Sequence, residues 1–245
     1  MRWEDTGLLI EIKDHGERDL VIRVFTENHG LCAGLVKGGQ NKKQKSILNP
    51  GAQLNLVWYA RLSDHLGTFQ VDVSRSRSIL FMGSKSQLYA FNSLCSIILL
   101  FLAEREPENL LYVKTVDLLE EIINNNDWLR NYVEWEFLFL QEIGYGLELS
   151  VCGVTGVRNN LTHVSPKSGK AVCEEVANPW KDKLFELPKF LVPTEMISKI
   201  SKGEALKGLL ISTHFFSIWA LPDLGKFQLP KARALFIKFL ERTSS

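Results

Sequence analysis

The chain has 245 residues, of which 45% are hydrophobic, so it is long enough for one large domain or two small ones with a sizeable core. Its four cysteines are too few for a disulfide framework, and its N-terminus, MRWEDTGLLI, lacks the long apolar segment of a secretory signal. The most apolar stretch, residues 88–103, is shorter than the ~20 residues of a membrane span, so we expect a reduced, cytoplasmic protein.

The net charge of +1 conceals an uneven distribution of charge along the chain. Residues 1–80 have 11 Lys and Arg against 9 Asp and Glu, residues 81–145 have 4 against 10, and residues 146–245 have 14 against 9. Two basic ends around an acidic middle favour a protein that contacts an anionic ligand with some of its faces only.

Residues 1–80 are predicted to form a small antiparallel β-barrel. Trp58 belongs to an alternating run that places it in the core and Tyr59 on the opposite face. Five short strands favour a barrel of the oligonucleotide-binding (OB) type, although the SH3-like barrel has the same number of strands. Turn-forming clusters delimit the five predicted strands, which are 7–13, 19–27, 31–36, 53–62 and 67–77.

The segment between the third and fourth predicted strands has a cluster of positive charge. Lys37, Lys42, Lys43 and Lys45 lie within nine residues, and no acidic residue occurs from position 28 to position 63. Because like charges at a surface repel one another, we expect a loop that binds a polyanion. The alternative is a solvated loop that is charged for solubility only.

Further residues extend this predicted DNA-binding surface. Tyr59 and Arg61 share the polar face of the fourth strand, and Arg75 and Arg77 lie at the end of the fifth. An aromatic ring beside cations is a combination with which proteins bind single-stranded nucleic acid. In the alternative interpretation, Tyr59 packs beneath the helices.

After residue 83 the spacing of apolar residues changes from two to about 3.6, which predicts a helical domain. An α+β chain is therefore expected, with an OB-type barrel over residues 1–80 and a helical domain over residues 81–245. Residues 146–180 have no sustained period and are expected to be irregular. The predicted helices are 85–104, 107–124 (closed by Asn124, Asn125 and Asn126), 127–143, 193–201, 204–220 and 229–241.

A degenerate zinc-ribbon-like frame lies within residues 148–178. Cys152, Thr155, Cys173 and Val176 occupy the four positions of a C-x2-C…C-x2-C pattern, but only two of them are thiols. His163 would supply at most a third ligand. We expect no bound metal, with both cysteines packed as small apolar residues.

No motif for covalent chemistry is complete in this chain. The segment from Gly34 to Gly39 has the glycine spacing of a phosphate-binding loop, but Gln40 and Asn41 follow where Lys and Ser or Thr are needed. We therefore expect neither an enzyme nor a cofactor. The alternative from another class, a nuclease or nucleotidyl transferase, needs clustered carboxylates for metal ions.

The basic C-terminal third contains a second candidate site. A cationic groove lined by aromatic rings would suit a short acidic peptide that ends in apolar residues. The alternative is an amphipathic helical bundle with lysines on its surface. The residues of this candidate groove are Lys199, Lys202, Lys207, Lys231, Arg233, Phe215, Phe216, Trp219 and Phe236.

Several short motifs follow one another in a characteristic order. They are MRWEDTGLLI, Glu17-Arg18-Asp19, TENHG at 26–30, Val36-Lys37-Gly38-Gly39, Leu48-Asn49-Pro50-Gly51, FLFL at 137–140, GYGL at 144–147 and the cysteine frame with Ser165-Pro166 and Gly169. The ordered set is similar to the RecO family of bacterial recombination mediators over essentially the whole chain.

This resemblance implies an OB-type barrel followed by a helical domain, which binds single- and double-stranded DNA and anneals complementary strands without a nucleotide. It also implies action with RecR, capture of the acidic C-terminal tail of single-strand-binding protein, help in loading RecA, and a place at the nucleoid. The family's basic DNA face matches residues 37–45, Arg61, Arg75 and Arg77 in kind and place.

The family's pocket for the tail of single-strand-binding protein lies in the helical region. Some relatives have a four-cysteine zinc site at this frame, which is not carried over to Cys152 and Cys173. A scaffold that bridges repair proteins with little DNA affinity of its own is the alternative.

Overall fold

The computed structural model describes residues 1–62, 65–77, 81, 83–124, 127–193, 197 and 199–243, without the side chain of Lys43. The chain divides into two units, Met1–Leu119 (unit 1) and Glu120–Ser245 (unit 2). Each unit is described by itself. The division between these units falls after Leu119, inside a helix. The domain boundary expected between residues 80 and 81 stays a prediction.

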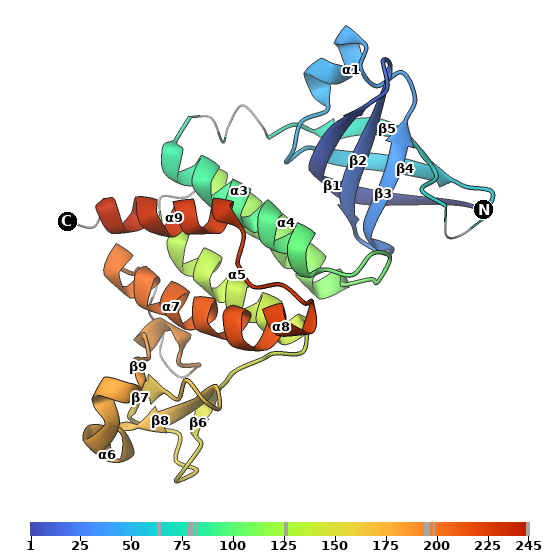
Figure 1. Ribbon diagram of the computed structural model, residues 1–245. Coiled ribbons are helices and arrows are strands. Elements are labelled where there is room, and N and C mark those ends of the chain that lie inside the picture. The colour runs from blue at the N-terminus through green and yellow to red at the C-terminus, as the bar shows by residue number, and fades with distance from the viewer. Residues whose placement is uncertain are drawn as a thin grey trace. The chain divides into compact units, whose positions relative to one another are not determined.

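Five strands close into a barrel in unit 1, as predicted (Figure 1). Around the barrel the order is β1-β2-β3-β5-β4, and all neighbours are antiparallel except β3 and β5, which pair in parallel at Leu35 and Thr68. A closed ring with an odd number of strands cannot alternate in direction throughout, so the expected fully antiparallel barrel was wrong at this one pair. The strands are β1 (Arg2–His15), β2 (Asp19–Thr26), β3 (Gly30–Val36), β4 (Gln53–Tyr59) and β5 (Thr68–Arg75).

Strand β1 is longer than predicted because it pairs with two neighbours. Residues 7–15 pair with β2 and residues 2–8 pair with β4, and a β-bulge between Leu9 and Glu11 lets the strand bend from one to the other. The first residues of β1 were not predicted, because Arg2 and Glu4 are charged and give no apolar alternation. They belong to the sheet because they pair with β4.

The barrel interior is filled by alternate apolar residues of all five strands. Leu9, Ile22, Leu54 and Phe69 are at most 2% exposed. Gly34 of β3 faces the ring of Phe69 so closely that a Cβ at this position would lie 2.4 Å from it. The predicted core position of Trp58 is confirmed, with 4% exposure.

A short helix, α1 (Lys42–Ile47), stands where the sequence analysis expected a loop of lysines. Asn41 caps it, since its side-chain oxygen accepts a hydrogen bond from the backbone N–H of Gln44 at 2.9 Å. The Lys-Lys-Gln-Lys run consists of good helix formers, and no helix breaker follows until Asn49-Pro50. The loop prediction was therefore wrong for these six residues.

Two predicted helices follow the barrel. Helix α3 (Lys85–Phe101) belongs to unit 1, and α4 (Asn109–Asn124) runs from unit 1 into unit 2. The beginning of α4 packs on the barrel, since the ring of Tyr112 meets Phe25 edge-on at 5.5 Å. Asn125 and Asn126, which were predicted to close this helix, lie outside the described residues.

Unit 2 is built around helices α5 (Leu129–Glu142), α7 (Lys202–Phe215) and α9 (Lys231–Arg242). A capping box of Ser201 and Glu204 begins α7, which continues through a π-helical turn, Phe216–Ala220, into α8 (Leu221–Asp223). Of the predicted helix at 193–201, residues 194–196 and 198 lie outside the described chain, and the others are not helical. No helix in the described ranges is long and apolar enough to cross a membrane.

Residues 146–180, which were expected to be irregular, contain most of a small sheet. Its strand order is β6-β8-β7-β9. These strands have only two to five residues, too few for an alternating pattern to emerge from the sequence. The elements are β6 (Glu148–Cys152), β7 (Leu161–Val164), β8 (Lys170–Cys173), α6 (Glu174–Ala177), β9 (Phe185–Glu186) and the 3-10 helices Asn178–Lys183 and Lys189–Leu191.

Candidate nucleic-acid interface

The first part of the candidate interface is the lysine cluster on and before α1, which we name the α1 lysines: Lys37, Lys42, Lys43 and Lys45. Lys37, Lys42 and Lys45 are exposed, and the side chain of Lys43 lies outside the described residues. The Nζ atom of Lys45 lies 3.5 Å from Oδ1 of Asp14 in an exposed pair. Such a pair is weak, so a phosphate can replace the carboxylate.

The segment before α1 is tied to the β1–β2 turn at one end of the barrel. The backbone N–H of Gln40 donates to the carbonyl of Arg18 at 3.0 Å, and its side-chain amide donates to the carbonyls of Gly16 and Asp19 at 3.1 and 2.9 Å. The N–H of Gly38 donates to the Asp19 carboxylate at 2.8 Å. These bonds fix the backbone segment that leads into α1.

Tyr59 and Arg61 lie at the opposite end of β4 from α1, so the structure does not bring them beside the lysines. Six steps from Gln53 to Tyr59 correspond to about 20 Å along a strand. The Tyr59 hydroxyl donates to Oε1 of Gln70 at 2.5 Å, and the Arg2 guanidinium lies 5.9 Å from the Tyr59 ring centre. Arg61 is exposed.

The two arginines predicted at the end of β5 have different surroundings. Arg75 is exposed opposite Gln53. Arg77 is only 2% exposed, and its guanidinium donates to the carbonyl of Gly51 at 3.2 Å and to Oε1 of Gln53 at 3.3 Å. Arg77 thus holds the turn before β4 and does not face a solvent-borne phosphate. The alternation of the strand run gave no sign of this burial.

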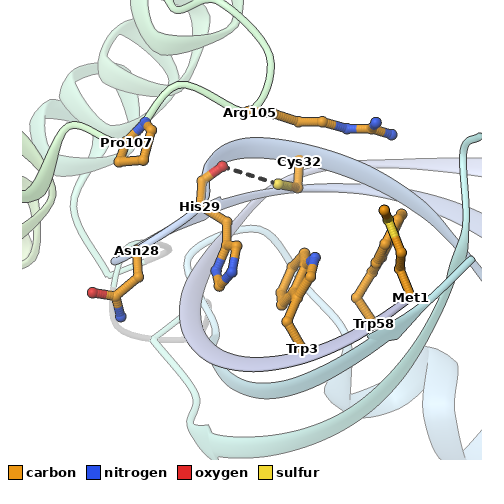
Figure 2. A pocket seen from close by; sticks show the side chains of 8 residues that line it. All are labelled: Met1, Trp3, Asn28, His29, Cys32, Trp58, Arg105 and Pro107. Carbon is orange, nitrogen blue, oxygen red and sulfur yellow. Dashed lines mark hydrogen bonds between the residues drawn. The ribbon is translucent and has the colours of Figure 1, made fainter. Parts of the chain in front are cut away.

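A pocket of about 190 Å³, for which the sequence contains no signal, lies at the Tyr59 end of the barrel (Figure 2). The rings of His29, Trp3 and Trp58 lie in a row along it. The ring centres of Trp3 and His29 are 4.0 Å apart and those of Trp3 and Trp58 are 5.4 Å apart, with the planes nearly parallel. The Arg105 guanidinium lies 5.5 Å from the Trp58 ring centre. We name this site, formed by Trp3, His29, Trp58 and Arg105, the ring pocket.

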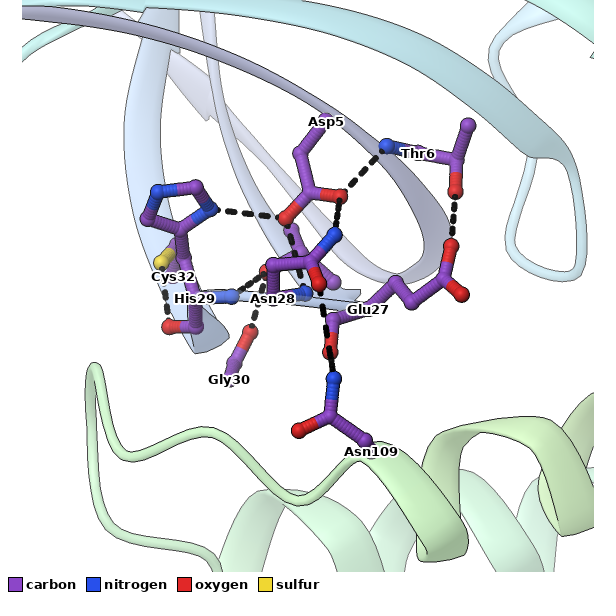
Figure 3. Close-up of polar contacts among 9 residues, drawn as sticks. Asp5, Thr6, Glu27, Asn28, His29, Gly30, Cys32 and Asn109 are labelled. Atoms are coloured by element: carbon purple, nitrogen blue, oxygen red, sulfur yellow. Dashed lines mark hydrogen bonds and ion pairs between the residues drawn. The ribbon is translucent and has the colours of Figure 1, made fainter.

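Asp5 fixes one wall of the ring pocket (Figure 3). Its carboxylate accepts hydrogen bonds from the backbone N–H groups of Thr6 and Asn28 at 2.8 and 2.9 Å, from the Asn28 side chain at 3.0 Å and from Nδ1 of His29 at 2.7 Å. Burial acts to raise the pKa of Asp5, but these hydrogen bonds outweigh burial and hold the pKa below its usual value. Because the ionised carboxylate only accepts, Nδ1 of His29 has the proton, which sets the ring orientation.

Three of the predicted cations of the C-terminal groove have partners at the surface of unit 2. Nζ of Lys199 lies 3.0 Å from the carboxylate of Asp127, Nζ of Lys202 donates to the Thr243 carbonyl at 2.8 Å, and Lys207 pairs with Glu186. These contacts are exposed, so water and anions compete with them.

Three of the four aromatic residues predicted for that groove lie in the core, and the fourth, Trp219, is half-buried. Phe215, Phe216 and Phe236 are fully buried, and Trp219 packs on Phe215 at 4.3 Å between ring centres. Arg233 is 1% exposed and forms a bidentate ion pair with Glu136. The apolar faces of α7 and α9 turn inward, so these residues do not line an open groove.

Cys152 and Cys173 lie close together, at the ends of β6 and β8, and both are buried. Among the described residues, no three His, Cys, Asp or Glu side chains are gathered so that they could hold a metal ion. The backbone N–H of Cys173 donates to the Cys152 sulfur at 3.4 Å, and Thr155 Oγ1 lies 3.6 Å from the Cys173 sulfur. Burial acts to raise the pKa of Cys152, but hydrogen bonds from Thr155 and from the N–H groups of Cys173 and Val154 lower the pKa to about 6. The donors suited to a metal-bound thiolate are thus still present.

Comparisons with known proteins cover both halves of the chain. A family model described as "Recombination protein O N terminal" matches residues 1–77, and one described as "Recombination protein O C terminal" matches residues 85–218. Relatives named "DNA repair protein RecO" include those of Ruegeria sp., 39% identical, and Cereibacter sphaeroides, 41% identical, each over 242 residues. Another, from Roseobacter denitrificans, is 40% identical over 242 residues. In all three cases the match spans 99% of this chain and 99% of the relative.

Proposed function

The chain belongs to the RecO family of DNA repair proteins, and on this premise we propose that its barrel binds single- and double-stranded DNA. The proposed contacts are the α1 lysines, Tyr59, Arg61 and Arg75. We propose further that the protein anneals complementary strands without a nucleotide. With RecR, it would help to load RecA onto single strands coated by single-strand-binding protein.

The observation that supports DNA binding most directly is the charge of α1. Its first turn contains lysines and no acidic residue, although cations at a helix N-terminus oppose the helix dipole. Although lysine is a good helix former, the helix dipole does not favour Lys42 and Lys43 at this place. Binding of phosphates does, because each neutralised phosphate releases a counterion.

Annealing then needs no covalent step. Two strands that are held on one basic surface lose part of their mutual repulsion, so complementary segments can meet and pair. A nuclease would instead degrade the strands, and incubation of the protein with DNA and Mg²⁺ distinguishes these two functions.

The test of the DNA-binding surface is the joint replacement of Lys42, Lys43 and Lys45 by alanine. With about five phosphate contacts, log K for a single strand should fall with log salt with a slope of about −3.5, and the triple variant should reduce this slope by about 2. A matched control replaces three exposed lysines of unit 2, Lys181, Lys183 and Lys189, which changes the net charge equally. An unchanged slope in the α1 variant would show that DNA binds to another surface of the protein.

A second assay tests the proposed annealing and the handling of coated strands. It measures annealing of fluorescent complementary oligonucleotides, bare and coated with single-strand-binding protein. Acceleration of both, fading with added salt, is expected. No acceleration of either would favour a scaffold with little DNA affinity. For the acidic tail we propose the exposed lysines Lys199, Lys202 and Lys207 with the half-buried Trp219, and without Phe216, which is buried. Joint replacement of the three lysines by alanine should weaken capture of a tail peptide while DNA binding remains.

A further inference from the structure

The ring pocket is at the same end of the barrel as Tyr59 and Arg61, far from the α1 lysines. We infer that it binds one unstacked nucleobase of single-stranded DNA, an inference that rests on the proposed DNA-binding function. Its size, its polar atoms and its rigidity support this inference.

The size of the ring pocket suits a single planar group. Its volume of about 190 Å³ is below the roughly 300–1,000 Å³ of sites that hold a drug-sized ligand. Trp58, at one end of the row, is 4% exposed, whereas the side chain of His29, at the other end, is 35% exposed. Rings that are already aligned with one another offer a base an aromatic surface without first having to be ordered.

The polar atoms of the ring pocket suit a heteroaromatic ligand better than an aliphatic one. In the described part of the chain, neither Nε2 of His29 nor Nε1 of Trp3 forms a hydrogen bond, so both are available to the donors and acceptors of a base edge. An aliphatic side chain of a protein partner would cover these atoms and leave them unsatisfied, which is costly. The Arg105 cation adds a group that stacks favourably with bases.

Three cations lie at the same end of the barrel as the ring pocket, and one of them, Arg2, forms an exposed ion pair with Glu4 that a phosphate can replace. Arg2 pairs in β1 with Tyr59, Arg61 follows β4, and the N-terminal ammonium of Met1 donates to the carbonyl of Ala60 at 2.7 Å. The phosphates on either side of a bound base therefore have positive partners within the same end of the barrel.

The walls of the ring pocket are fixed before any ligand arrives. Asp5 holds His29 and Asn28, as described above, on one side. On the other side, the N–H of Arg105 donates to the carbonyl of Leu31 at 3.0 Å. Gly30, at φ +67°, packs so closely that a Cβ there would lie 2.0 Å from the Glu106 carbonyl oxygen. A preformed site loses little conformational entropy on binding, which favours affinity.

A base pocket would also let the protein distinguish single strands from duplexes. In a duplex each base is paired and stacked, and extracting it costs energy that a single strand does not need. From Trp3 to Asp14, beside α1, strand β1 spans about 36 Å at ~3.3 Å per residue. A single strand that runs from the ring pocket to the α1 lysines would follow this path, and one OB barrel binds roughly 4–16 nucleotides.

The test compares a thymidine oligonucleotide with an abasic oligonucleotide of the same length, at one salt concentration. The wild-type protein should bind the thymidine strand about 5–150-fold more tightly, the range for loss of one stacked base. Trp3→Leu should lose most of this preference. The matched control, Trp180→Leu, removes a 55% exposed ring of unit 2 and should retain it.

A second measurement uses the wild-type protein alone and so does not depend on the folding of a variant. An oligonucleotide with 5-iododeoxyuridine, irradiated in the complex, should crosslink to Trp3 or His29, as mapped by mass spectrometry. Equal affinity for both oligonucleotides, or crosslinks only at Tyr59 or elsewhere, would overturn the inference while DNA binding stands. Absence of salt-sensitive binding to either strand would refute the proposed function itself, and the inference with it.

Discussion

Replacing Arg233 by methionine is expected to destabilise unit 2 strongly. The Arg233 side chain is 2% exposed and that of its partner Glu136 is 0% exposed. Nε and Nη2 of Arg233 donate to the two carboxylate oxygens at 3.0 and 2.8 Å, and Nη1 donates to Thr213 at 2.7 Å. Ser212 also donates to Glu136, at 2.5 Å. The substitution leaves a buried carboxylate without its counter-charge.

The expected loss is about 3–5 kcal/mol in the free energy of unfolding, the range for breaking a buried ion pair from one side. Glu136→Leu should cost a similar amount, because it leaves the guanidinium unpaired. The double variant removes both charges and fills the space with apolar atoms, so its stability should lie near or above that of the wild type. The two effects are therefore strongly non-additive.

Urea unfolding of the full chain, followed by circular dichroism and by tryptophan fluorescence, measures these changes, and both probes are needed because two units can unfold separately. The folded double variant should also bind the acidic tail peptide like the wild type, since a buried arginine offers a ligand no contact. Two results would refute the reasoning: a loss below about 1 kcal/mol for Arg233→Met, or a double variant whose loss equals the sum of the single losses.

Three further predictions concern the barrel, the ring pocket and the cysteine frame. Gly34→Ala should cost about 1–3 kcal/mol in urea unfolding, because the new Cβ would meet the Phe69 ring at 2.4 Å. The pKa of Asp5 is lowered on folding, so the ionised carboxylate stabilises the fold fully above about pH 4. This stabilisation is lost as the pH falls through the folded pKa, and Asp5→Asn should therefore make the free energy of unfolding depend less on pH in acid. Thr155→Cys with Val176→Cys completes the ligand frame, and should bind one zinc ion per chain and raise the Tm.

Each of these has a control in the same chain. Gly203→Ala has no atom closer than 3.7 Å to the new Cβ and should not destabilise the protein. Asp72→Asn changes an exposed carboxylate of β5 and should leave the acid loss as it is. The wild-type protein, with two thiols in the frame, should retain no zinc after dialysis and keep its Tm in the presence of a chelator. Zinc retained by the wild type, or none by the double cysteine variant, would contradict the account of the frame.

Much of the barrel could be predicted because its signals are local. Alternation along β4 and the turns between strands depend on neighbouring residues only, and the predicted runs correspond to all five strands. The parallel pairing of β3 and β5 and the first residues of β1 are decided by closure of the ring, which joins residues far apart in the chain. The short strands β6 to β9 escaped prediction for the same reason, since their partners, and not their own patterns, define them.

The sequence by itself determined where the charge lies: four lysines without an acid among them, of which three lie in α1 and Lys37 lies before it. Only the tertiary structure decided which cations face solvent, because Arg77 and Arg233 look like their exposed neighbours until the surrounding side chains bury them. It alone also assembled the ring pocket. Trp3, His29 and Trp58 are separated by 26 and 29 positions, and the pairing of β1 with β4 and the turn after β2 bring their rings into one row. Periodicity describes one element at a time, whereas a site shared by three elements exists only once the barrel has closed.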